Sequence, residues 1–155
     1  MKMLALTVLP MLLIAAPATA QTLKPTLDYA SAAKIPDGCL VWAAAHDRRM
    51  ATAILDARGM EVTFAHMDGV NMGIGDIARW KANSAAKFGR ATVENAARNP
   101  PANMPNVAAV GGGVPIYATD GTLLGGVGTS GGSPDEDAAC GAAGIAAAGL
   151  KPARP

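Results

Sequence analysis

Lys81 is the strongest candidate for a chemical role in the sequence, because it falls on the apolar stripe of a predicted helix. Apolar residues precede it by seven, four and three positions and follow it by four and seven, which is the spacing of one helix face. Lysine is almost never buried on such a face without a partner. Either its stem is covered while the ammonium reaches an edge, or it binds a carboxylate, a ligand or a neighbouring subunit.

A second candidate region for ligand binding is rich in glycine. Nine of the eighteen glycines lie between Gly111 and Gly132, although glycine is costly inside strands. One explanation is a backbone that approaches a ligand closely and cradles an anion at the start of the last helix; the other is tight turns and close packing. The spacing matches neither a P-loop nor a dinucleotide-binding fingerprint.

The two histidines, His46 and His66, have different expected roles. His46 falls in the last turn of a predicted helix, where it complements the helix dipole. His66 ends a predicted strand beside Met67, and imidazole and thioether are both iron ligands. Adjacent strand residues point to opposite faces, so His66 alone is the candidate metal ligand, with a surface role as the alternative. Arg90 is a candidate for bidentate binding of a carboxylate or an ordinary surface arginine.

A serine nucleophile is poorly supported. Residues 128–132 fit the Gly-x-Ser-x-Gly pattern around Ser130. A nucleophile elbow, however, needs a parallel sheet and a histidine downstream of the serine, and no histidine follows His66. We interpret the match as fortuitous.

The first twenty of the 155 residues resemble a secretory signal peptide. Lys2 precedes an apolar run, and an Ala-x-Ala site ends at Ala20, the pattern of a cleaved export signal. We therefore expect a periplasmic or secreted protein with no membrane span in the mature chain. The mature chain would carry 12 basic and 12 acidic residues (13 − 1 against 12) and no basic stripe, which argues against nucleic acid as a partner.

Cys39 and Cys140 are the two cysteines. Export favours a disulfide between them, which would close a loop of about a hundred residues. Two separate buried thiols are the alternative.

The elements that must position these residues form an α+β pattern. We expect residues 21–39 to be a lead-in and the start of a first helix from Pro36, and residues 151–155 to be a tail. Strands are predicted at 50–55, 60–67, 108–110, 114–118 and 123–128, and further helices at 74–88, at 92–98 with Thr92 as N-cap, and at 134–150. Because the strands come in hairpins, the pattern predicts a single domain with an antiparallel sheet and helices on its faces.

Over residues 40–150 the sequence resembles the GlcG/HbpS-type haem-binding (haem-degrading-domain) family, which includes the carboxy-terminal domain of PduO-type proteins. The resemblance rests on six blocks in order: Leu55–Gly59, His66–Gly69, Lys81–Ala85, Phe88–Thr92, Gly111–Pro115 and Gly128–Asp137. It implies a profilin-like or roadblock-like fold with five antiparallel strands, in dimers that assemble further, often to octamers. His66 departs from the arginine common at that position, and Pro36 and Gly38 suggest a shortened first helix.

The leading hypothesis from this resemblance is a periplasmic protein that binds haem or a related tetrapyrrole. Lys81, Arg90 and the backbone of the glycine-rich segments would hold its carboxylates, while Phe88 and Met67 would contact the ring. Axial ligation would come from His66 or from a hydroxyl such as Thr92 or Thr129. The remaining candidate contacts come from the glycine-rich segments: Gly111, Gly112, Gly113, Ser130 and Gly131.

Two alternatives remain open. One is a cofactor-independent hydrolase or isomerase of a small carboxylated metabolite, with Lys81 as the acid/base or electrostatic group. The other is a non-catalytic accessory oligomer, in which Lys81 and the glycine loops build subunit contacts.

Overall fold

The computed structural model describes residues 23–155, so the predicted signal peptide lies outside the described residues. The chain folds into one α+β domain whose elements, in order, are α1 (Tyr29–Ala45), β1 (Ala51–Asp56), β2 (Glu61–His66), α2 (Met72–Phe88), α3 (Thr92–Ala97), β3 (Gly113–Tyr117), β4 (Leu123–Ser130) and α4 (Pro134–Ala147).

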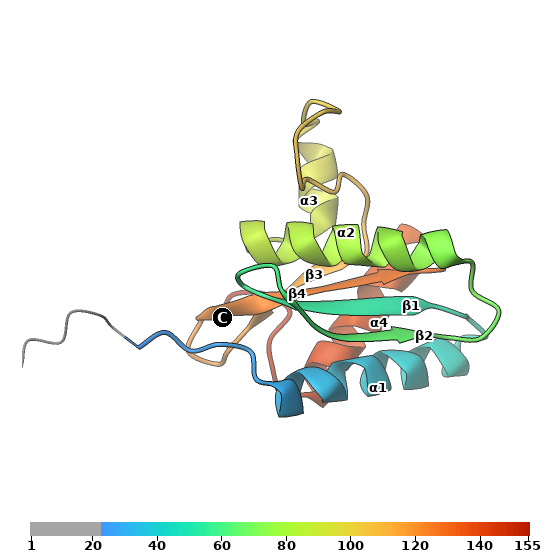
Figure 1. Ribbon diagram of the computed structural model, residues 1–155, viewed down its shortest axis with the longest axis horizontal. Helices are drawn as coiled ribbons and strands as arrows, with labels where there is room; N and C mark the ends of the chain where they lie inside the picture. Colours follow the sequence, from blue (N-terminus) through green and yellow to red (C-terminus); the bar gives the residue numbers. More distant parts are fainter. Residues whose placement is uncertain (1–22) are drawn as a thin grey trace, which may run out of the picture.

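The sheet is antiparallel, with the strand order β2-β1-β4-β3. Two hairpins, β1–β2 and β3–β4, meet where β1 pairs with β4. Figure 1 shows α2 on one face of the sheet and α1 and α4 together on the other. One apolar cluster, which includes Ile35, Ile54 and Ile145, lies between the sheet and the α1–α4 pair, and a second lies beneath α2.

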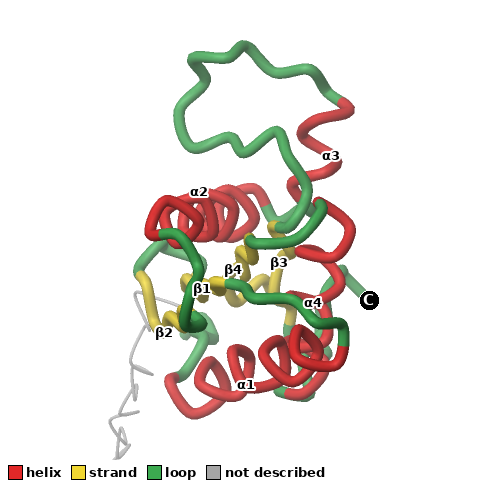
Figure 2. The backbone as a smooth tube through the Cα atoms, turned by 90° about the vertical axis from the view of Figure 1, so that its right-hand side faces the viewer, coloured by secondary structure: helices red, strands yellow, loops and turns green. Residues whose placement is uncertain are grey.

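Among the described residues the sheet has four strands, so the prediction of five strands is wrong. The strand expected at 108–110 is absent because side chains bind the backbone there. Ser84 Oγ accepts the N–H of Ala108 at 3.0 Å, and Asn95 Nδ2 donates to the Ala108 carbonyl at 3.2 Å. Figure 2 shows this segment as part of a long loop that leaves α3 and projects from the body of the fold.

The first helix begins earlier than predicted and is not shortened by Pro36. It starts after Asp28, whose side chain accepts the N–H of Ser31, so Pro36 lies inside the helix and not at its first position. A proline inside a helix leaves the carbonyl four residues before it without its usual donor. Here that carbonyl belongs to Ala32, and it accepts a hydrogen bond from the Thr63 hydroxyl on β2 at 3.2 Å.

Gly38 allows α1 to cross α4 closely. A Cβ atom at Gly38 would lie 2.6 Å from the Cβ of Ala147, and one at Gly144 would lie 2.3 Å from the carbonyl oxygen of Ile35. The glycine that suggested a helix end is therefore used for packing between two helices.

Candidate functional site

Lys81 on α2 is buried, and its side chain is 3% exposed. Its Nζ lies 2.7 Å from Oδ2 of Asp137 on α4, 3.0 Å from the carbonyl oxygen of Thr129 and 3.5 Å from Oγ of Ser130. The structure thus selects one of the alternatives open for this lysine: it reaches a carboxylate within its own chain.

Small residues bring α2 close enough to the sheet for this contact. A Cβ atom at Gly128 would lie 1.9 Å from the carbonyl oxygen of Ala78, and one at Gly126 would lie 2.4 Å from the backbone nitrogen of Ala86. The glycines of β4 therefore let the helix lie directly on the strand, and Lys81 extends past the strand's end to α4.

Asp137 is held as firmly as its partner. Its Oδ1 accepts the N–H of Gly132 at 2.8 Å while Oδ2 accepts from Lys81. Burial raises the pKa of Asp137 above its ordinary value, although the hydrogen bonds from Lys81 and Gly132 favour the charged form. Asp137 is the partner of Lys81 that the sequence does not reveal, because the acidic run 135–137 is already explained as the charged first turn of a helix.

The ion pair forms part of the wall of a pocket of about 340 Å³. Ser130 lies beside the pair, and the apolar wall is formed by Ile77, Trp80, Val110 and Pro134. Ile77 and Trp80 are 39% and 42% exposed. In all three contacts Lys81 Nζ donates to an oxygen atom, so this geometry gives no support to Lys81 as a base that activates Ser130.

The glycine-rich segments close the backbone around Lys81. A Cβ atom at Gly112 would lie 2.8 Å from Lys81 Nζ and 2.6 Å from Cβ of Asp137, and one at Gly113 would lie 2.4 Å from Thr92. A Cβ atom at Gly111 would lie 3.0 Å from Cβ of Pro134, and one at Gly131 would lie 2.4 Å from the carbonyl oxygen of Arg49. These contacts support the packing explanation of the glycines.

Thr92 and Thr129, the two hydroxyl candidates for axial ligation, are both fully buried. The Thr92 hydroxyl accepts the N–H of Gly113 at 2.9 Å. The Thr129 hydroxyl lies 3.5 Å from that of Thr52 and 3.9 Å from Sγ of Cys39. Each hydroxyl is thus engaged inside the core.

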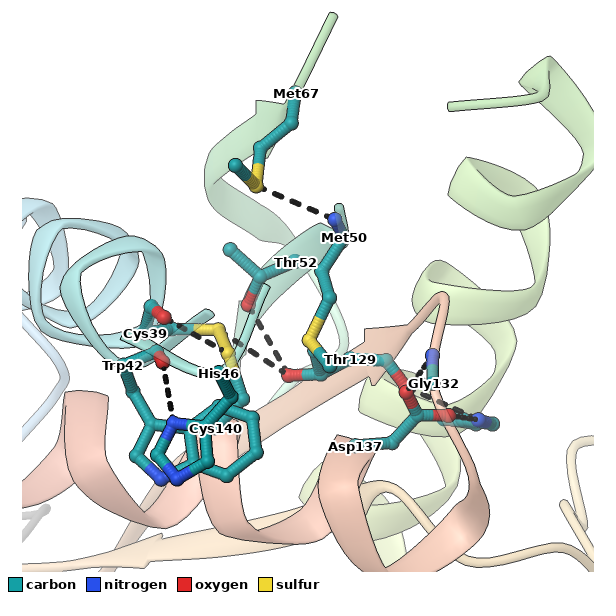
Figure 3. Close-up of a disulfide and its surroundings, with 11 residues drawn as sticks. Cys39, Trp42, His46, Met50, Thr52, Met67, Thr129, Gly132, Asp137 and Cys140 are labelled. Atoms are coloured by element: carbon teal, nitrogen blue, oxygen red, sulfur yellow. Dashed lines mark hydrogen bonds and ion pairs between the residues drawn. A yellow bond between two sulfur atoms is a disulfide. The ribbon is translucent and has the colours of Figure 1, made fainter. Parts of the chain in front are cut away.

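His66 and Met67 line a second, more open pocket of about 500 Å³ together with Arg49 and Asp68. His66 is half-buried and approaches the Asn71 carbonyl at 3.4 Å through Nε2. The Met67 sulfur instead accepts the N–H of Met50 at 3.3 Å, as Figure 3 shows. Of the two adjacent residues, His66 is therefore the one that keeps a possible ligating atom, ring nitrogen Nδ1, outside the recorded hydrogen bonds.

Phe88 and Arg90 lie at the opposite end of α2 from His66. The imidazole approaches the helix near Gly75, and thirteen residues at 1.5 Å each place Phe88 about 20 Å further along the axis. The Arg90 guanidinium lies 5.1 Å from the Phe88 ring centroid. Within one chain, the predicted contact residues therefore occupy three separate places.

A disulfide joins Cys39 on α1 to Cys140 on α4. Figure 3 shows it near Met50 and Thr129, with Trp42 and His46 stacked beside it at a ring-centroid distance of 3.8 Å. His46 Nδ1 lies 2.7 Å from the Trp42 carbonyl, so this histidine is tied to its own helix.

Two further classes of site find no support in the part of the chain that the structure describes. Residues 23–155 contain no cluster of three metal-ligating side chains. They also contain no helix long and apolar enough to cross a bilayer.

Comparison with known proteins gives one family and several related structures. A family model described as a haem-degrading protein, HbpS-like, matches residues 27–146. The crystal structure of a double mutant of HbpS from Streptomyces reticuli is 28% identical, with 85% of this chain and 96% of that chain covered and a TM-score of 0.75.

Two other structures show the same fold. An HbpS structure is 27% identical, covers 86% of this chain and 97% of that chain, and has a TM-score of 0.77. A structure described as a PduOC:haem complex is 24% identical, covers 84% of this chain and all of that chain, and has a TM-score of 0.75. No curated protein matches the sequence.

Proposed function

The chain belongs to the HbpS-like family of haem-degrading proteins, and from this membership we propose that it binds haem. The similar PduOC structure is described as a haem complex. The observation that carries the proposal within this chain is the pocket at the end of β2, where a half-buried imidazole and a guanidinium face one cavity.

The residues of this pocket fit the chemistry of haem. A volume of about 500 Å³ lies within the range of roughly 300–1,000 Å³ typical of small-molecule sites. His66 supplies an imidazole, a common haem-iron ligand. Arg49 donates one hydrogen bond to the Asp68 carbonyl at 3.3 Å and forms no ion pair among residues 23–155, so its guanidinium is available to a propionate.

This assignment changes the set of residues expected to hold the ligand. His66 would ligate the iron, Arg49 would hold a propionate, and the Met67 side chain would form the cavity wall. Bound haem would supply redox chemistry at its iron, while the protein fixes its orientation. Lys81 and Arg90 lie outside this pocket. The three hydrogen bonds that Lys81 Nζ donates to oxygen atoms argue against Lys81 as the general base of a cofactor-independent enzyme.

Haemin titration tests the proposal, with the second histidine as a matched control. The wild-type protein should shift the Soret band, and His66→Ala should weaken haemin binding about tenfold or more. His46→Ala should bind as the wild type does, because His46 is tied to the Trp42 carbonyl away from the pocket. Unchanged binding in His66→Ala, or its loss in His46→Ala, would contradict the site.

We also propose that the protein is exported to the periplasm or secreted. The disulfide supports this, because such bonds persist in oxidising compartments, and the sequence of residues 1–20 has the pattern of an export signal. N-terminal sequencing of the mature protein should begin at Gln21. A mature chain that retains Met1 would contradict the proposal.

Self-association is the third part of the proposed function. Trp80 and Ile77 expose apolar surface beside the Lys81–Asp137 pocket, and exposed tryptophan is typical of interfaces. Light scattering should find a dimer or a larger assembly that Trp80→Lys dissociates and that Val93→Lys on α3 does not. A monomeric wild type, or equal effects of both variants, would count against this surface.

A further inference from the structure

A separate pocket of about 270 Å³ lies between the α2–α3 junction and the projecting loop. Its wall combines two guanidinium groups, from Arg90 and Arg98, with the apolar surfaces of Pro101, Met104 and Val107. We propose that this pocket binds a small organic carboxylate with an apolar body. The two arginines would hold the carboxylate, and the loop would cover the body of the ligand.

Arg90 is oriented by a buried network. Its Nε donates to Oδ1 of Asn95, which is 1% exposed. Asn95 in turn donates to Ser84 Oγ at 3.0 Å and to the Ala108 carbonyl. The guanidinium is therefore held at the pocket through one nitrogen, and its other two nitrogens form no hydrogen bond within residues 23–155 that the structure records.

The pocket has an excess of positive charge. Neither Arg90 nor Arg98 forms an ion pair among the described residues, and the pocket lining contains no acidic residue. Glu94 is the nearby carboxylate on α3, and its Oε1 accepts the N–H of Ala91 at 3.1 Å. Two arginines that line one pocket without a counter-charge favour an anion, and the planar donor geometry of a guanidinium group matches a carboxylate.

The size and lining of the pocket further restrict the class of ligand that it could bind. A cavity of about 270 Å³ lies just below the range of roughly 300–1,000 Å³ typical of ligand sites, so it suits a compact molecule and not a tetrapyrrole. The apolar surfaces of proline, methionine and valine contribute no binding free energy to a bare inorganic anion. They favour a ligand whose apolar group excludes water from them. An aromatic or branched monocarboxylate meets both requirements.

The loop that forms one wall is restricted in conformation. Pro100, Pro101 and Pro105 fix three backbone φ angles within six residues, and the loop is anchored where Ala108 binds Ser84 and Asn95. A wall restricted before binding lowers the entropy cost of holding a ligand.

Benzoate is the probe for this pocket, with benzamide as its neutral counterpart. Calorimetry on the wild-type protein should show saturable binding of benzoate, and benzamide should bind about tenfold more weakly, because charge-assisted hydrogen bonds contribute most of the affinity. Arg98→Gln should weaken benzoate binding to a similar extent, and Arg98 is exposed, so this variant should fold. Lys87→Gln removes another exposed cation near the end of α2 and should leave benzoate binding unchanged.

Met104→Ser tests the apolar wall and should weaken benzoate binding without affecting the binding of inorganic phosphate. The proposal is overturned if benzoate does not saturate, if benzamide or phosphate binds as tightly as benzoate, or if Arg98→Gln binds benzoate as the wild type does. Haemin titration of Arg98→Gln separates the two sites: it should match the wild type whether or not the benzoate results support this pocket.

Discussion

At the scale of single residues, the Lys81–Asp137 pair is a buried ion pair between two helices that lie on opposite faces of the sheet. Both side chains are 3% exposed, so each charge would be left buried and unpaired if its partner were removed. Such a loss typically costs about 3–5 kcal/mol, even where replacement of the whole pair is nearly neutral. The pair joins α2 to the start of α4. Removal of both charges should therefore lower the stability of the fold less than removal of one charge.

We predict that Lys81→Met lowers the free energy of unfolding by about 3–5 kcal/mol. Asp137→Asn should also destabilise, although the amide oxygen can still accept the Gly132 N–H. The double variant should lose clearly less than the sum of the two single losses, since no unpaired charge remains. Urea unfolding of the four proteins measures this, with Lys87→Met as the exposed control on the same helix; additive losses would contradict direct coupling.

The sequence indicated the importance of Lys81 but not its partner. A lysine on an apolar helix face needs a partner in any fold that buries this face, so helical periodicity alone is sufficient to identify Lys81 as an important residue. The choice among Asp135, Glu136 and Asp137 depends on the crossing of α2 and α4 at the end of β4, which is a long-range property. Burial of Thr92 and Thr129 is long-range in the same sense, and for that reason their hydroxyls looked available in the sequence.

At the scale of elements, close helix packing depends on glycines whose neighbours cannot move. A Cβ atom at Gly144 would lie 2.3 Å from the Ile35 carbonyl oxygen and 2.9 Å from Cγ2 of the same residue. Backbone atoms of α1 would have to shift, so α1 and α4 would separate.

We expect Gly144→Ala to destabilise the protein by about 1–3 kcal/mol, the usual cost of overpacking. Gly73→Ala is the matched control, because Gly73 is also helical and a Cβ there would meet only Asn71 Oδ1 at 3.4 Å. Alanine should be neutral or slightly stabilising at Gly73 through helix propensity. Thermal unfolding compares the two, and equal midpoints would show that α1 and α4 tolerate the extra atom.

The start of α4 carries a pH-dependent cap. Glu136 accepts the Ser133 N–H at 2.8 Å and pairs with Arg48 at 2.8 Å. The Arg48 hydrogen bond, followed by that of Ser133, lowers the pKa of Glu136 from 4.5 to about 2. A lowered pKa in the folded state means that the carboxylate stabilises the fold above pH 4.5 and that this contribution is lost as the pH falls toward 2.

Glu136→Gln should therefore destabilise the protein most at neutral pH, and its difference from the wild type should shrink between about pH 4.5 and pH 2. The amide can still accept the Ser133 N–H, so the variant isolates the charge. Arg48→Gln should give the same pH dependence, because it removes the other half of the pair. Urea unfolding across this range measures both variants; a difference that is independent of pH would rule out the carboxylate as its source.

Hairpins and the long α2 helix were predictable from local pattern, whereas two element boundaries were not. The strand expected at 108–110 has a suitable sequence, but the side chains of Ser84 and Asn95 occupy the backbone N–H and carbonyl of Ala108 that a neighbouring strand would otherwise bind. Pro36 normally marks a helix start, yet Thr63 on β2 satisfies the carbonyl that proline leaves free. In both cases a side chain distant in sequence decides the local structure.

At the scale of the whole molecule, the disulfide links the two ends of the domain. Cys39 and Cys140 are 101 residues apart, and every strand of the described sheet lies between them in the chain. The sequence allowed either a bond or two thiols, because the close crossing of α1 and α4 cannot be deduced from spacing. The bond restricts the unfolded chain over most of its length.

Removal of the Cys39–Cys140 bond should lower the free energy of unfolding by an amount similar to the loss of one partner of the Lys81–Asp137 pair. A loop of about 100 residues gives an entropic stabilisation of up to about 4.7 kcal/mol in the chain-entropy model, and measured losses for native bonds are about 2–5 kcal/mol. Cys39→Ala/Cys140→Ala should therefore unfold at a clearly lower urea concentration than the oxidised wild type. It should match the wild type unfolded in excess reductant, because both lack the bond. If the oxidised wild type contains no free thiol and still unfolds together with the double variant, the bond does not restrict the unfolded chain as the fold implies.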